Sequence, residues 1–243
     1  MSHLIGDRLF WAPLRSDVQK VLDLGTGTGI WAIDFADTFP SAEVIGTDLS
    51  AIQPNWLPPN LRFEIDDAEA DWTWEPSAFD YIHNRNFVCA IRNWPKLVRQ
   101  CFDFVKPGGW CEFHEKHPWF LSDDGTLSED HALYKWGKNF FDASVNFGTD
   151  ARAPQFLKQQ MLEAGFVNVE QHILKLPVGS WPKDPRLKRC GLFETVNMTD
   201  GISGLTTMLF TRALGWTREE VEVFLTEVRK EAKDRHIHSY YHL

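Results

Sequence analysis

A glycine-rich segment near the amino terminus has the residue types and spacing of a ligand-binding turn. It reads Asp-Leu-Gly-Thr-Gly-Thr-Gly from Asp23 to Gly29 and begins inside a short apolar run that is typical of a buried parallel strand. Glycines at a strand-to-helix turn permit a tight turn, a close approach of the backbone to a ligand and close packing of the helix. A dinucleotide-binding GxGxxG pattern would place its third glycine at position 30, which is Ile30. The observed GxGxG spacing therefore argues against a dinucleotide.

An acidic residue stands two positions before the first glycine of this loop. The dianionic pyrophosphate of a nicotinamide cofactor prefers bare amides at a helix amino terminus, so the carboxylate of Asp23 would repel it. The same carboxylate suits a ligand with an ammonium group, and S-adenosylmethionine presents one at its amino-acid end. We therefore expect S-adenosylmethionine, and S-adenosylhomocysteine as its product, to contact Asp23, Gly25, Gly27 and Gly29.

Acidic residues also close the next two predicted strands. Asp48, followed by Leu49, ends the second strand about 20 residues beyond the loop, where a carboxylate accepts hydrogen bonds from the ribose hydroxyls. Asp66, Asp67 and Ala68 follow the third strand, and we expect Asp67 to accept from the exocyclic amine of adenine, with Ala68 beside it. The alternative is a structural turn with Asp48 as a helix cap. Three anchors at the ends of three successive strands favour the cofactor site.

Strands and helices alternate where these residues occur, which predicts a doubly wound, mostly parallel α/β sheet of the Rossmann-like kind. Residues 18–115 form the expected cofactor-binding core. The pattern predicts strands over 21–24, 43–48, 61–65, 79–83 and 110–115, and helices over 30–39 and 93–105. Farther along it predicts helices around 133–140 and over 154–164, 201–215 and 217–233, a strand over 167–174 and a weak edge strand over 237–241.

The whole chain, 1–243, is expected to form a single domain with helical insertions at 116–152 and 179–216. Both insertions are rich in large apolar side chains, among them Trp119, Phe120, Trp136, Phe140, Phe141, Trp181, Phe193, Met198, Met208 and Phe210. Such side chains could line an apolar pocket, although core packing would explain most of them equally well. We interpret the two insertions as lids over a substrate.

Polar side chains at the carboxyl ends of the fourth and fifth strands are expected to face the acceptor, because ligands of open parallel sheets bind at that edge. They are His83, Asn84 and Arg85 near the fourth strand end, and His114, Glu115 and His117 near the fifth. His83 is the first candidate for a catalytic general base, since an imidazole titrates near neutral pH, and Glu115 and His117 are the others. Asn84 and Arg85 are expected to contact the cofactor, with Arg85 pairing with a carboxylate.

The composition argues against several classes of partner. The net charge of −9 argues against nucleic acid, because no excess of Lys and Arg is available to displace counterions. The four cysteines lack zinc-ligand spacing, so no metal is expected. The amino terminus lacks the apolar core of a signal peptide, and no run approaches the ~20 apolar residues of a membrane span. We expect a cytoplasmic protein that has no membrane partner.

Longer segments of the chain closely resemble the LaeA-like fungal methyltransferases over about residues 7–243. The segments that carry the resemblance are VLDLGTGTGIWAIDFA, GTDLSAIQPNWLPPN, FEIDDAE, FDYIHNRN and KPGGW. The stretch QPNWLPPN, from Gln53 to Asn60, is far more specific than the glycine loop. The resemblance implies a class I methyltransferase fold and S-adenosylmethionine as methyl donor. It also implies either a tailoring reaction of secondary metabolism or a regulatory role in nuclear complexes.

Three functions remain open at this point. The first is methyl transfer to a small, largely apolar acceptor, which the aromatic insertions favour. The second is regulation through a protein partner, in the nucleus, with or without methylation. The third is a non-methylating reaction by an enzyme that keeps S-adenosylmethionine bound. A homodimer is compatible with each of them.

Overall fold

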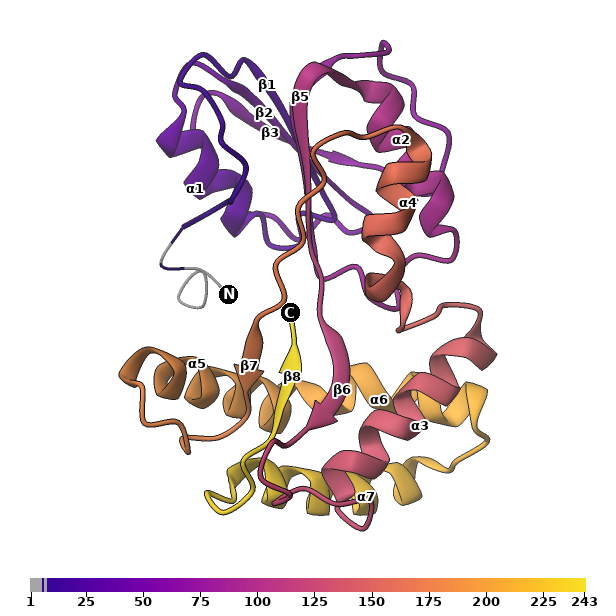
Figure 1. Cartoon of the computed structure of the whole chain (residues 1–243). Helices are drawn as coiled ribbons and strands as arrows, with labels where there is room; N and C mark the ends of the chain where they lie inside the picture. The colour runs from indigo at the N-terminus through magenta and orange to yellow at the C-terminus, as the bar shows by residue number, and fades with distance from the viewer. Residues whose placement is uncertain (1–5, 7) are drawn as a thin grey trace.

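The computed structural model describes residues 6 and 8–243 and contains two sheets (Figure 1). The larger sheet is parallel, with five strands in the order β3-β2-β1-β4-β5. Its strands are β1 (Lys20–Leu24), β2 (Glu43–Asp48), β3 (Leu61–Ile65), β4 (Phe79–Arg85) and β5 (Val105–His114). Because all five run in the same direction, their carboxyl ends meet at one edge of the sheet. The predicted Rossmann-like α/β arrangement is therefore confirmed.

Helices cover both faces of this sheet. On one face lies α1 (Ile30–Thr38), and on the other lie α2 (Trp94–Phe104) and α4 (Leu157–Ala164). Each face has its own buried apolar cluster, so the strands are covered on both sides as their apolar sequences predict. The helix predicted over 30–39 is present as α1; its first residue, Ile30, is 61% exposed, whereas Trp31 is buried.

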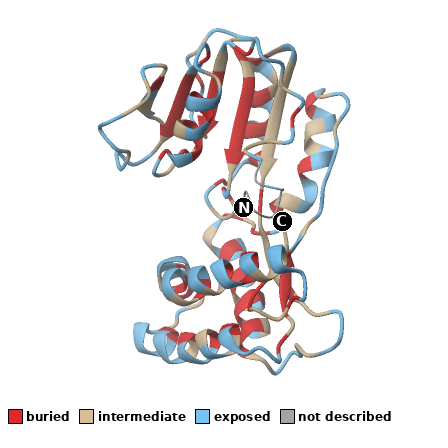
Figure 2. Cartoon of the chain, turned by 90° about the vertical axis from the view of Figure 1, so that its left-hand side faces the viewer, coloured by how far each residue is buried: buried red, intermediate tan, exposed pale blue. Residues whose placement is uncertain are grey.

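The rest of the chain forms a smaller unit next to the carboxyl ends of the parallel strands (Figure 1). Its antiparallel sheet has the order β6-β8-β7. Its elements are β6 (His117–Leu121), α3 (Ala132–Phe147), β7 (Lys175–Pro177), α5 (Pro185–Val196), the π-helical turn η2 (Asn197–Gly201), α6 (Ile202–Ala213), α7 (Arg218–Lys233) and β8 (Tyr240–His242). The two insertions thus pack on each other and on α7, around a core of their own (Figure 2).

The sequence predictions fail at three places in this part of the chain. Residues 167–174 form no strand, and Val167 and Ile173 are 78% and 62% exposed because no neighbouring strand covers them. The tail strand β8 lies in the centre of the smaller sheet, not at its edge, because it pairs with both β6 and β7. The sequence pattern also misses β6 and α5. The strand β6 was missed because Pro118 within it is unfavourable for a strand. The helix α5 could have been predicted, because Asp184 is a favourable amino-terminal cap residue just before Pro185.

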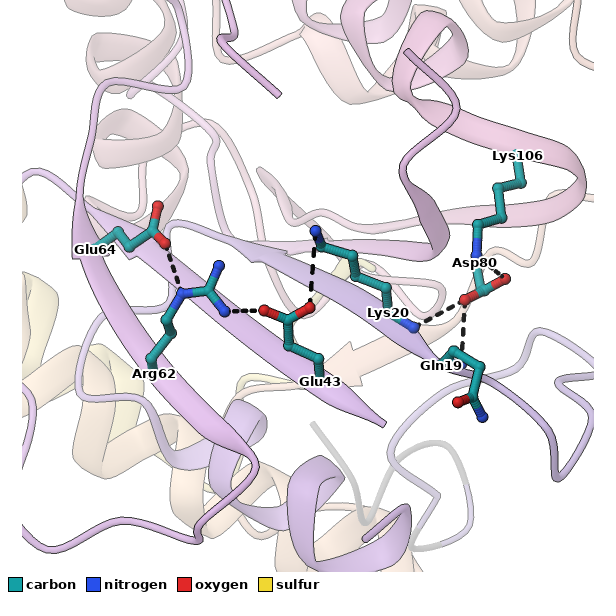
Figure 3. Close-up of polar contacts among 7 residues, drawn as sticks. All are labelled: Gln19, Lys20, Glu43, Arg62, Glu64, Asp80 and Lys106. Atoms are coloured by element: carbon teal, nitrogen blue, oxygen red, sulfur yellow. Dashed lines mark hydrogen bonds and ion pairs between the residues drawn. The ribbon is translucent and has the colours of Figure 1, made fainter. Parts of the chain in front are cut away.

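The amino ends of the parallel strands carry a row of charged and polar contacts (Figure 3). The row consists of Glu64, Arg62, Glu43, Lys20, Gln19, Asp80 and Lys106. Partly exposed ion pairs contribute about 0–1 kcal/mol each, so this row aligns neighbouring strands without dominating stability. A hollow of about 410 Å³ between Ser41 and Arg62 lies at this end too. It is at the opposite end of the strands from the glycine loop, so it is no part of the site predicted there.

Candidate functional site

The glycine loop joins β1 to α1, and its three glycines all have positive φ: +61° at Gly25, +57° at Gly27 and +79° at Gly29. A Cβ on Gly25 would lie 1.7 Å from the ring of Phe87, and one on Gly29 would lie 2.3 Å from the ring of Phe63. These two positions need glycine because protein side chains pack against them. A Cβ on Gly27 would meet no atom of the described residues within 4 Å. The open side of the loop is therefore at Gly27.

The carboxylate of Asp48 lies next to this open side. Its Oδ2 accepts the N–H of Gly27 over 2.8 Å, and its Oδ1 accepts the N–H of Ser50 over 2.9 Å. The side chain of Gln53 donates to the carbonyl of Gly27 over 2.7 Å. Asp48 thereby fixes the loop to the end of β2, while each of its oxygens keeps a lone pair for a further bond. The next residue, Leu49, is 72% exposed and presents its side chain to solvent.

The segment after β3 lies beside Asp48. The N–H of Asp66 donates to the carbonyl of Asp48 over 3.0 Å. Asp67 is exposed, and the carbonyl of Ala68 is held by the indole N–H of Trp72 over 3.1 Å. The three strand ends that the sequence singled out are therefore neighbours at one edge of the sheet.

Asp23 lies beneath the glycine loop and has only 3% of its surface exposed. Its Oδ2 accepts the hydroxyl of Thr26 over 2.6 Å, and its Oδ1 lies 2.7 Å from Nδ1 of His83. Both carboxylate oxygens are thus engaged inside the protein. We expected Asp23 to face an ammonium group, whereas in this geometry it holds the loop from below.

His83 lies under α1 and not at the open edge of the sheet. Its side chain has no exposed surface and stacks on the ring of Trp31, with ring centroids 3.7 Å apart and an interplanar angle of 6°. Burial lowers the pKa of His83, although the neighbouring Asp23 opposes that shift. A ring without exposed surface cannot contact an acceptor. The prediction that His83 is the general base is therefore wrong for this geometry.

Glu115 and Asn84 are buried where β5 and β4 end. The carboxyl group of Glu115 accepts the backbone N–H groups of Phe87 and Val88 over 2.8 and 2.9 Å. With its nitrogen turned toward Glu115, the amide of Asn84 donates to Oε1 over 2.7 Å. Burial raises the pKa of Glu115 to about 8, although the two backbone donors oppose the shift. Both side chains hold the loop that follows β4, and neither faces the open edge.

Arg85 and His117 keep partly exposed side chains. Arg85 is the last residue of β4, opposite His114 of β5. His117 begins β6, with its ring centroid 5.1 Å from that of Phe141 and its Nε2 in contact with the amide of Gln155. Burial lowers the pKa of His117, which keeps the imidazole neutral near pH 7 and able to accept a proton. Of the three predicted catalytic residues, His117 is the one whose exposure permits that role.

A polar network that the sequence analysis missed lies under α1, with little of its side-chain surface exposed. Glu112 of β5 accepts the N–H groups of Trp11 and Ala12, each over 2.8 Å, and the hydroxyl of Tyr81 over 3.0 Å. Glu112 also contacts the imidazole of His114. The signal that could have revealed it is the alternation of polar residues on two neighbouring strands, Tyr81 and His83 on β4 and Glu112 and His114 on β5. The network ties the segment before β1 to the face of the sheet that α1 covers.

Among the described residues, no group of three or more His, Cys, Asp and Glu side chains is arranged to hold a metal ion. Nor does any helix within this described part of the chain have the length and apolar character needed to cross a membrane.

The chain is similar to known methyltransferases over most of its length. A family model described as a methyltransferase domain matches residues 2–171. The methyltransferase pytC of Aspergillus terreus is 44% identical over 239 residues, which cover 98% of this chain and 74% of pytC. The secondary metabolism regulator LAE1 of Cochliobolus heterostrophus is 36% identical, over 96% of this chain and 78% of LAE1. Phosphoethanolamine N-methyltransferase 2 of Haemonchus contortus, solved with S-adenosyl-L-methionine, has a similar fold: its TM-score is 0.51 at 20% identity, over 95% of this chain and 48% of that one.

Proposed function

Because this chain belongs to the family of methyltransferase domains, we propose that it transfers a methyl group from S-adenosylmethionine to a small, largely apolar acceptor in secondary metabolism. The observation that carries the proposal is the open side of Gly27, which lies beside the carboxylate of Asp48. The two fungal relatives, one a methyltransferase and the other a regulator of secondary metabolism, support the biological setting.

The residues around the loop fit this cofactor. Asp48 can accept hydrogen bonds from both ribose hydroxyls, because backbone N–H groups fix its two oxygens without using all their lone pairs. The exposed Leu49 and Asp67, with Ala68, would hold the adenine, and Arg85 would pair with the carboxylate of the amino-acid end. When bound, S-adenosylmethionine supplies a methyl group on a sulfonium, which is already activated for displacement.

The contribution of the chain itself is mainly alignment of the acceptor with the cofactor. A well-oriented pair of reactants can gain about 7–11 kcal/mol from proximity alone. A base is needed only where the acceptor must lose a proton, and we propose His117 for that role because His83 and Glu115 are buried and engaged.

Apolar side chains on α5 and α6 support an apolar acceptor. Figure 1 shows these helices on the side of the smaller unit that is nearer to the five-stranded sheet, with α7 beyond them. Leu192, Val196, Leu205 and Met208 on them are 51%, 53%, 61% and 49% exposed. The i, i+4 and i, i+3 spacings of these residues place each pair on one face of its helix, and contiguous exposed apolar patches mark binding sites. We propose that it forms one wall of the acceptor site.

Gly27→Ala is expected to weaken the binding of S-adenosylhomocysteine by about tenfold, equivalent to about 1.4 kcal/mol, because the new Cβ would occupy the open side of the loop. The positive φ of Gly27 adds strain of about 1–2 kcal/mol, which should appear as a lower thermal midpoint. Isothermal titration calorimetry measures the affinity. Gly204→Ala on α6 is the matched control, since its Cβ meets open space and its φ is not positive. Equal affinities for the two variants would contradict a ligand at Gly27.

The decisive experiment is incubation of the purified protein with methyl-labelled S-adenosylmethionine and a fungal metabolite extract, followed by mass spectrometry. We expect one small molecule to gain a labelled methyl group, and Asp48→Ala to abolish the gain. Label that appears only in protein would favour the regulatory function, which the similarity to LAE1 suggests as the second candidate. Tight cofactor binding with no labelled product would favour a non-methylating reaction.

We further propose that the protein works in the cytoplasm on a small molecule and not on nucleic acid. The net charge of −9 supports a substrate other than nucleic acid, because no excess of Lys and Arg is available to displace counterions.

A further inference from the structure

The imidazole of His83 links the glycine loop to the polar network of Glu112 and His114 under α1. On one side its Nδ1 contacts Asp23, whose other oxygen accepts the hydroxyl of Thr26 inside the glycine loop. On the other side its ring meets that of His114 edge-on, with centroids 5.3 Å apart. His83 thus stands directly below the loop, fixed by its stack on Trp31.

The contacts of the two ring nitrogens define the tautomer of His83. Its Nε2 is buried without a hydrogen-bond partner among the described residues. A proton on Nε2 would leave a buried donor unsatisfied, whereas a proton on Nδ1 can be donated to Asp23. Burial also lowers the pKa of His83 and keeps the ring neutral at pH 7. The neutral ring with its proton on Nδ1 is therefore the form that fits this site.

We propose that His83 is a positioning residue: its Nδ1–H orients the carboxylate of Asp23, which holds Thr26 and thereby sets the backbone of the cofactor-binding loop. The backbone N–H of Thr26 donates to the carbonyl of Thr47 over 2.8 Å, so Thr26 is held both by its side chain and by its backbone. The next residue is Gly27, at the open side of the loop. This inference rests on the proposed binding of S-adenosylmethionine.

Two substitutions separate the donor of His83 from its ring. His83→Asn keeps a nitrogen donor near the position of Nδ1 but removes the part of the ring that stacks on Trp31. His83→Phe keeps the stacking ring but removes the donor. We expect His83→Phe to weaken S-adenosylhomocysteine binding about tenfold, because a hydrogen bond to a charged group is lost. His83→Asn should retain affinity within about threefold. If the ring served only for packing, the order of the two variants would be reversed.

A double-mutant cycle tests whether the effect passes through Asp23. Thr26→Val removes the hydroxyl that donates to Asp23, whereas the control Thr26→Ser keeps it. We expect the losses of affinity from His83→Phe and Thr26→Val to be less than additive, because both act on one carboxylate. Fully additive losses would overturn the proposal, as would equal affinities of His83→Phe and the parent protein.

Nitrogen NMR of the ligand-free protein supplies a readout that needs no cofactor. We expect the ¹⁵N shifts of His83 to show a proton on Nδ1 and none on Nε2 at pH 7. A proton on Nε2 would overturn the inference, whether or not the cofactor binds and even if His83→Phe fails to fold. Failure of the parent protein to bind S-adenosylhomocysteine, together with the expected tautomer, would instead refute the proposed function.

Discussion

Asp48→Ala is expected to weaken S-adenosylhomocysteine binding by at least about 100-fold. Asp48 can accept two hydrogen bonds from the ribose, and bonds to a charged group contribute about 1.5–3 kcal/mol each. The variant also releases the N–H groups of Gly27 and Ser50, so the loop loses its attachment to β2. Calorimetry at a temperature at which both proteins are folded gives the ratio of dissociation constants.

Two further variants show whether the loss comes from the ribose contact. Asp67→Ala removes one exposed carboxylate at the adenine side, and we expect a loss of about tenfold. Asp37→Ala, on the exposed face of α1, should leave affinity unchanged. Equal losses for Asp48→Ala and Asp67→Ala would show that the ribose and adenine ends are wrongly assigned.

The second large expected effect is that of Glu115 on the free energy of unfolding and on its dependence on pH. Burial raises the pKa of Glu115 from its ordinary 4.5 to about 8. Between these values the folded protein binds more protons than the unfolded chain. The stabilising contribution of Glu115 is therefore complete below about pH 4.5 and is lost as the pH rises through about 8. The shift corresponds to at most about 5 kcal/mol in the free energy of unfolding.

Glu115→Gln removes this titration while keeping one oxygen to accept from Phe87 or Val88. Urea unfolding of both proteins at several pH values measures the effect. We expect the stability of the parent protein to fall, relative to Glu115→Gln, as the pH is raised from about 5 to 8. Glu219→Gln, at an exposed position of α7, serves as control. Parallel stability curves for the parent and Glu115→Gln would contradict a buried, proton-binding Glu115.

The glycine loop could be recognised in the sequence because the pattern that marks it is local. The glycine spacing, the acidic residue at the end of the second strand and the apolar strands between them all lie within a short stretch of chain. Strand–helix alternation also predicted the parallel sheet, since a right-handed crossover brings successive strand ends to one edge. Asp48 and Gly27 are consequently next to each other, as their positions in the pattern suggested.

The direction of each side chain could not be read in the same way. Successive residues of a strand point to opposite faces, and the sequence does not say which face α1 will cover. His83 shares the α1 face with Asp23, and Asn84 points the other way toward Glu115. Both were expected at the open edge for their position at a strand end. The pleat of β4 instead turns His83 toward α1, where its ring stacks on Trp31.

The sequence by itself thus determined the fold class, the glycine turn between β1 and α1, and the family, because each depends on residue spacing along the chain. The tertiary structure alone decided that the two insertions pack together with α7, that β8 lies between β6 and β7, and that Asp23 and His83 lie beneath the loop. These are contacts between residues far apart in sequence. They depend on which surfaces are buried together, and that follows from the packing of the whole chain and not from any single segment.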